Sequence, residues 1–61
     1  MRYSRLELFD AMGIKRSTIA EGFYPSGPQE FSIAVKSLAA GIYFLRLTMD
    51  GRITTEHFVV E

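Results

Sequence analysis

Apolar and polar residues alternate along most of this chain with the period of two that is typical of β-strands. No window contains the i, i+3, i+4, i+7 apolar stripe of an amphipathic helix. The strand-like segments are separated by turn-forming residues about every ten positions, which is the rhythm of a β-sandwich or a β-barrel. We predict strands over residues 3–9, 14–20, 30–35, 42–48 and 53–60, and no helix longer than a turn.

Turn chemistry supports these boundaries. Asp10 and Gly13 enclose a turn in which the aspartate can bond its own downstream backbone and the glycine can supply a positive φ. Asp50-Gly51 is a dipeptide favoured in the type I′ turn of a β-hairpin. Between these turns, residues 21–29 contain two glycines and two prolines, and we predict a loop there.

Residues 37–47 are the most informative stretch. Small residues lead to Gly41, and a strand follows with Tyr43 and Leu45 on one face. In Greek-key sandwiches, a tyrosine at such a corner donates a hydrogen bond to the backbone a few residues upstream. The spacing Leu38-x-x-Gly41-x-Tyr43 fits this role. The predicted fold is therefore a small Ig-like Greek-key β-sandwich of about five strands.

Length and composition narrow the function. Sixty-one residues allow one domain, spanning 1–61, and chains this short have marginal cores. Cysteine is absent, which excludes disulfides and zinc–thiolate sites. Seven basic and seven acidic side chains give zero net charge, so the chain lacks the basic footprint of a nucleic-acid-binding protein. The longest apolar run, Ile42 to Leu45, is far too short to span a membrane.

Catalytic and metal-binding chemistry are not indicated. His57 is the only histidine, and its neighbours Thr55 and Glu56 point to alternating faces of a strand. Asp10 and Asp50 are explained by turn chemistry. A closed metal site requires about four ligands, which this chain does not offer in one motif. We predict no enzymatic activity, no metal and no cofactor.

The order and spacing of these pieces resemble the type A C-terminal sorting domain of the type IX secretion system. That family has a strand ending in Tyr/Phe-Asp-x-x-Gly, an alternating strand followed by a Leu-x-x-Gly-x-Tyr corner, and a final hairpin that ends in a short apolar strand. The matching segments here are residues 6–13, 31–43 and 54–60. The positions singled out as sorting-motif or structural residues are Asp10, Gly13, Leu38, Gly41, Tyr43, Leu45, Asp50, Gly51, Phe58 and Val60.

The chain departs from the family pattern at a few places. Ile14 separates Gly13 from the first basic residue, and His57 and Glu61 stand where lysine or arginine is usual. The family's module also usually begins with one or two further strands, so we expect this chain to be a fragment of a longer parent. A sandwich that lacks those strands keeps open edges, at residues 3–9 and 53–60, and we expect a homodimer by edge pairing or strand swapping.

The resemblance implies a delivery label with no catalytic role. Such a domain follows its own N-terminal cargo domain and is read by an outer-membrane translocon after the cargo reaches the periplasm. A surface sortase often then removes it. The implied location is the cell surface or the medium, reached through the periplasm and outer membrane of a Gram-negative bacterium.

Two other classes remain open from the residues. One is an Ig-like structural module, such as the related domain of flagellar hook-cap proteins, which shares the Gly-x-Tyr corner. The other is a small carbohydrate-binding sandwich that would use its aromatic side chains. A cargo enzyme in the parent would favour the label, hook-assembly segments would favour the structural module, and glycan binding would favour the third class.

Overall fold

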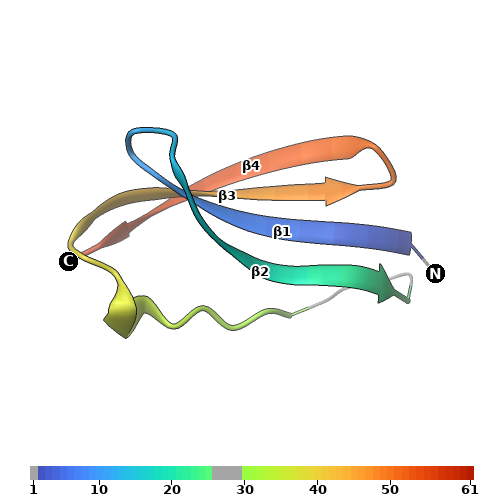
Figure 1. Ribbon diagram of the computed structural model, residues 1–61, viewed down its shortest axis with the longest axis horizontal. Coiled ribbons are helices and arrows are strands. Elements are labelled where there is room, and N and C mark those ends of the chain that lie inside the picture. The colour runs from blue at the N-terminus through green and yellow to red at the C-terminus, as the bar shows by residue number, and fades with distance from the viewer. Residues whose placement is uncertain (1, 26–29) are drawn as a thin grey trace.

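The computed structural model describes residues 2–25 and 30–61, which form one four-stranded antiparallel sheet (Figure 1). The strands are β1 (Arg2–Asp10), β2 (Lys15–Tyr24), β3 (Gly41–Met49) and β4 (Arg52–Val60), in the spatial order β2-β1-β3-β4. One turn of 3₁₀ helix, η1 (Val35–Ser37), is the only helical element in the described residues. The all-β prediction is confirmed, and four of the predicted strands are present.

Both predicted tight turns are present. At the first, Asp10 Oδ1 accepts hydrogen bonds from the backbone N–H groups of Met12 at 2.9 Å and Ile14 at 3.0 Å. Gly13 closes this turn with φ 82°. At the second, Asp50 and Gly51 have φ 49° and 81°, the pair of positive values that a type I′ turn requires.

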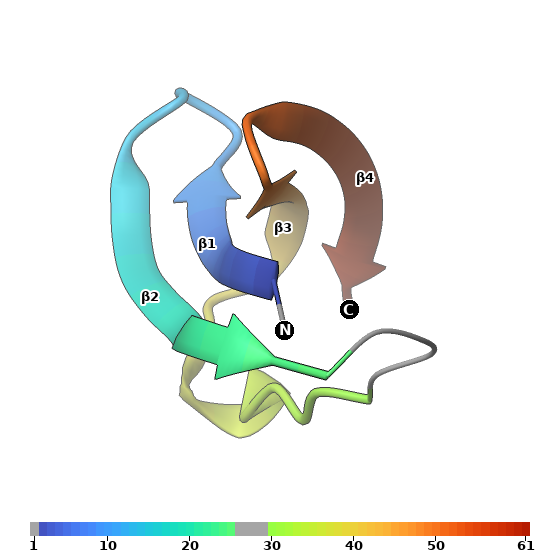
Figure 2. The same ribbon diagram turned by 90° about the vertical axis from the view of Figure 1, so that its right-hand side faces the viewer.

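The connection between β2 and β3 crosses one face of the sheet. Both strands are antiparallel to β1 and lie on either side of it, so they run parallel to each other. Parallel neighbours of this kind need a crossover of about a dozen residues or more. The chain between Tyr24 and Gly41 provides it, and Figure 2 shows residues 30–40 running across the open side of the curled sheet. The rings of Tyr24 and Phe31 meet edge to face, with centroids 5.5 Å apart, which fixes the crossover against β2.

The strand predicted over residues 30–35 is wrong. Residues 30–34 have no regular structure, and η1 follows them. Phe31 and Ile33 are half-buried while Ser32 and Ala34 are exposed, so the alternation is present. This alternation arises because every second side chain faces the sheet that the segment crosses. The backbone of the segment is not paired with any strand.

Two further expectations also change. The loop predicted over 21–29 is too long, because β2 continues to Tyr24; residues 26–29 lie outside the described part of the chain. Residues 3–9 were expected at an open edge, but β1 is paired on both sides, and the outer strands are β2 and β4. The described residues form a single sheet, so the two packed sheets of a sandwich are not seen among them.

The core lies on the face of the sheet that the crossover covers. Leu6 pairs with Leu47 and Leu8 with Leu45, which places four leucines on this face of the two central strands. Leu8 is the most buried of them, with 2% of its surface exposed.

The sheet curls because β2 is irregular. Its register against β1 shifts twice, between Leu6 and Glu7 and between Leu8 and Phe9. Each shift is a bulge, which increases the local twist of an antiparallel pair. The bend brings β2 towards the crossover, as Figure 2 shows, and it places Lys15 opposite Phe9 at the turn end of the strand.

The burial of Leu8 predicts a large effect of truncation. Leu8→Ala should lower the free energy of unfolding by about 2–5 kcal/mol, because it removes buried methyl groups and leaves a cavity. The matched control is Ile53→Ala on β4, because 64% of the surface of Ile53 is exposed. That change should stay within about 0.5 kcal/mol. Urea denaturation followed by far-UV circular dichroism measures both changes. Equal midpoints for the two variants would contradict the assigned core.

Candidate functional site

The corner before β3 is held by Tyr43. Only 7% of this residue is exposed, and its hydroxyl donates a hydrogen bond of 2.6 Å to the backbone carbonyl of Ala39. This is the upstream backbone contact that the sequence predicts for a corner tyrosine. The ring stacks on Phe58 of β4, with centroids 5.8 Å apart and an interplanar angle of 23°. Tyr43 therefore joins the end of the crossover to the last two strands.

Gly41 starts β3 with φ 152°. A Cβ at this position would meet no atom within 4 Å, so space does not require glycine. The backbone conformation does, because this region of positive φ is nearly restricted to glycine. Gly41 pairs with Val60, which brings the corner directly beside the last residue of β4.

Most of the singled-out positions gather at one end of the sheet, which we call the corner end. Register pairs Asp10 with Tyr43, Tyr43 with Phe58 and Gly41 with Val60. The corner end thus contains the first turn, the corner and the end of β4, with the C-terminus (Figure 1). Its members among the predicted positions are Asp10, Gly13, Leu38, Gly41, Tyr43, Phe58 and Val60.

The other three positions lie elsewhere. Leu45 is half-buried on the core face, opposite Leu8. Asp50 and Gly51 form the β3–β4 turn at the opposite end, which we call the hairpin end. There the Asp50 carboxylate lies 3.5 Å from the guanidinium of Arg2, at the start of β1.

The face opposite the core contains a charged cluster that the sequence reading did not identify. Glu7 is only 4% exposed, and its carboxylate contacts three cations: Arg5 at 3.1 Å, Lys15 at 3.1 Å and Arg46 at 3.3 Å. The bulged register of β2 brings Lys15 within reach from one side, and β3 supplies Arg46 from the other. The alternation of Arg5 and Glu7 with leucines signals a polar face, but nothing in the sequence marks Arg46 as a partner.

These contacts keep the carboxylate ionised. The hydrogen bond from Lys15 lowers the pKa of Glu7 the most, and burial works in the opposite direction. The hydrogen bond from Arg46 and the charge of Arg5 lower it further. The net effect is a pKa below the ordinary value for glutamate, because opposite charges and donated hydrogen bonds favour the charged form.

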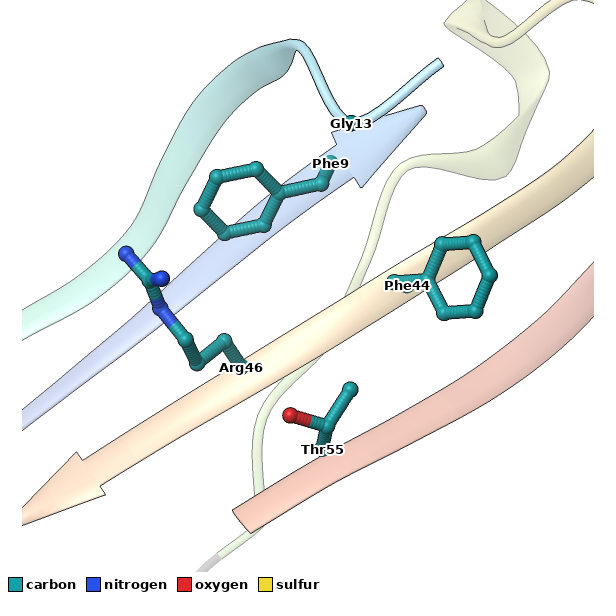
Figure 3. A pocket seen from close by; sticks show the side chains of 5 residues that line it. All are labelled: Phe9, Gly13, Phe44, Arg46 and Thr55. Carbon is teal, nitrogen blue, oxygen red and sulfur yellow. The ribbon is translucent and has the colours of Figure 1, made fainter. Parts of the chain in front are cut away.

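Beside this cluster lies a shallow hollow of about 260 Å³ (Figure 3). It is lined by Phe9, Gly13, Phe44, Arg46 and Thr55. The Arg46 guanidinium carbon lies 4.6 Å from the centre of the Phe9 ring, a cation–π contact. Phe44 leans instead towards β4, where its ring centroid is 6.4 Å from that of His57.

The described residues offer no site for a metal ion: in them, no three histidine, cysteine or acidic side chains gather closely enough. His57 is exposed on β4. No helix within residues 2–25 and 30–61 is long and apolar enough to cross a membrane.

Comparison with known protein families identifies the fold's role. Residues 2–61 match the family model of the secretion system C-terminal sorting domain. The chain therefore belongs to this family, the C-terminal sorting domains of the type IX secretion system. Searches of curated proteins and of solved structures gave no match.

Membership of the family defines what the chain does in outline. It is a non-catalytic secretion signal for a cargo protein, directed to secretion or the cell surface in bacteria. Of the classes left open by the residues, the match therefore favours the sorting label over the structural module and the carbohydrate-binding sandwich.

The corner hydrogen bond can be tested by removing one oxygen. Tyr43→Phe should lower the free energy of unfolding by about 1 kcal/mol, because the Ala39 carbonyl loses its donor while the ring packing remains. Tyr24→Phe is the matched control, since the Tyr24 hydroxyl has no hydrogen-bond partner among the described residues. Thermal denaturation of the two variants beside the parent measures the difference. If Tyr43→Phe unfolds at the same temperature as the parent, the hydrogen bond does not stabilise the corner.

The Glu7 cluster predicts a pH dependence. Because the folded-state pKa of Glu7 is lowered, its contribution to stability is complete above the unfolded value of about 4.3 and is lost as the pH falls through the folded value. The stability difference between the parent and Glu7→Gln should therefore be constant near neutral pH and shrink in acid below that value. Glu56→Gln, at an exposed position on β4, is the control: its free energy of unfolding should differ less from that of the parent across the same pH range. Denaturant midpoints across the acid range measure this, and a difference that does not change with pH would count against the cluster.

Proposed function

We propose that this module is the label by which an outer-membrane translocon recognises a cargo domain on its N-terminal side. The cargo would first reach the periplasm of a Gram-negative bacterium, and a surface sortase would remove the label after export. The observation that carries this proposal is the family match over residues 2–61. In this proposal, the machinery reads the label as a folded surface.

The recognition surface that we propose is the corner end. β1 begins with Arg2 at the hairpin end, whereas the corner end lies at the opposite end of the sheet (Figure 1). A folded cargo domain would therefore stand at one end of the label and leave the other accessible. The concentration of sorting-motif positions at the corner end supports this assignment.

We further propose that the sheet is one layer of an Ig-like Greek-key sandwich in the parent protein. The crossover covers the core face on the β2 side, while Leu45, Leu47 and Met49 of β3 remain only half-buried. Apolar side chains that are partly covered in this way favour a further layer of chain over them. Strands contributed from upstream in the parent would complete that layer.

Export of a reporter tests the label. Fused behind a periplasmic reporter in a host with the type IX machinery, the module should bring the reporter to the surface or the medium, and the reporter alone should stay in the periplasm. The same reporter with a longer native module from the parent should be measured beside it, because the upstream layer contributes to folding. If the longer module also leaves the reporter in the periplasm, the translocon proposal fails.

We propose a homodimer through the outer edge of β4. Within residues 2–25 and 30–61, this strand pairs only with β3, and Ile53 and Val59 on it are 64% and 60% exposed. Unpaired edges recruit other strands, and small cores gain stability by oligomerising. Light scattering over a wide concentration range should show the mass doubling at the concentrated end. Thr55→Pro, which blocks ladder bonds in β4, should reduce the doubling, and a monomer mass throughout for the parent would exclude the dimer.

A further inference from the structure

We infer that the hollow beside the Glu7 cluster binds one apolar side chain of an acidic peptide segment from a partner protein. The hollow lies on the face opposite the core, so its occupation does not disturb the packing of the leucines. It is built from three strands and one turn, which gives it a fixed shape. It is separate from the corner tyrosine, whose side chain belongs to the core face.

The shape follows from the divergence of two phenyl rings. Phe9 and Phe44 are directly opposite in the β1–β3 register, so their side chains start from neighbouring positions on one face. One ring lies under the Arg46 guanidinium and the other leans towards β4, as Figure 3 shows. The gap between them has Thr55 on one side and Gly13, which has no side chain, at the rim.

The size of the hollow limits the occupant. Sites for drug-sized ligands have volumes of about 300–1,000 Å³ and enclose most of the ligand. At about 260 Å³ and open to solvent, this hollow accommodates a single side chain. Two phenyl rings and a threonine methyl group favour an aromatic or aliphatic group, because apolar surface removed from water supplies the free energy.

The charge of the rim sets the character of the flanking residues. Arg5, Lys15 and Arg46 surround the single carboxylate of Glu7, so the cluster has a net charge of +2. Their side chains are 39%, 46% and 40% exposed and can reach a partner. Two other carboxylates lie near the cluster: Asp10, which is paired with Arg16 at 3.7 Å, and Glu21, which is opposite Arg5 in the β1–β2 register. A peptide with acidic residues beside its apolar anchor complements this rim, and complementary charge raises both association rate and specificity.

The binding experiment uses short blocked peptides and amide chemical shifts. Acetyl-Asp-Phe-Asp-amide should shift the amide signals of Phe9, Gly13, Phe44, Arg46 and Thr55, with a dissociation constant in the millimolar range. Acetyl-Asn-Phe-Asn-amide should bind at least about five-fold more weakly, and added salt should reduce the difference between the two peptides. Equal binding of the two peptides, or shifts spread over the whole sheet, would overturn the inference.

A matched pair of variants locates the site. Thr54 and Thr55 are adjacent, exposed residues of β4 that face opposite sides of the sheet. Thr55→Trp fills the hollow and should abolish the localised shifts, whereas Thr54→Trp should retain them. Peptide shifts that persist in Thr55→Trp would contradict the site.

Glucuronic acid is the competing probe. If it causes larger amide shifts than the peptide at the same residues, the hollow is an anionic-sugar site and the peptide inference is wrong.

The export assay adds a second readout, and this part rests on the proposed function. If the unmodified label exports the reporter, the Thr55→Trp label should leave the reporter in the periplasm. The Thr54→Trp label should still export it. If the parent label itself does not export, the proposed function fails and the peptide experiment alone decides the inference. If both tryptophan variants export as well as the parent, the hollow is not read during secretion and its assignment as a partner site is withdrawn.

Discussion

Two parallel strands separated by an antiparallel one can be joined only by chain that crosses the middle strand, and this constraint organises the molecule. β2 and β3 flank β1, so the connection between them must pass over one face of the sheet, and in this molecule it passes over the leucine face. The crossover therefore acts as a second layer over part of the apolar face of the sheet. The Tyr43 hydrogen bond to Ala39 fixes the point at which the crossover returns to the sheet.

The other face of the sheet is ordered by charge. A nearly buried carboxylate is costly unless it is paired and hydrogen-bonded, and Glu7 satisfies this condition through cations from three strands. One of these cations, Arg46, also lies over the Phe9 ring and lines the neighbouring hollow. One face thus supplies stability to the fold, and the other presents a surface of defined shape and positive charge.

The sequence predicts much of this fold because its signals are local. Alternation finds the four strands, and the chemistry of Asp10 and Asp50 places two turns. The corner tyrosine is also found, because its partner lies only four residues upstream. Residues 30–35 are misassigned because alternation reports which way side chains face, and a segment crossing a sheet alternates as a paired strand does. The Glu7 cluster is missed because Arg46 lies 39 residues away, and only the register of β1 against β3 brings them together.

The positions of the two chain ends have a mechanical consequence. β1 begins at the hairpin end and β4 finishes at the corner end, with β3 between them and antiparallel to both (Figure 1). Tension applied between the ends would load the β1–β3 and β3–β4 ladders along the strand axis, so that many hydrogen bonds share the force at once. A sheet pulled in this way resists in shear and does not unzip bond by bond. If the molecule were pulled at its C-terminal end while its N-terminal end was held, it would consequently keep its fold until the strand ladders broke as a whole.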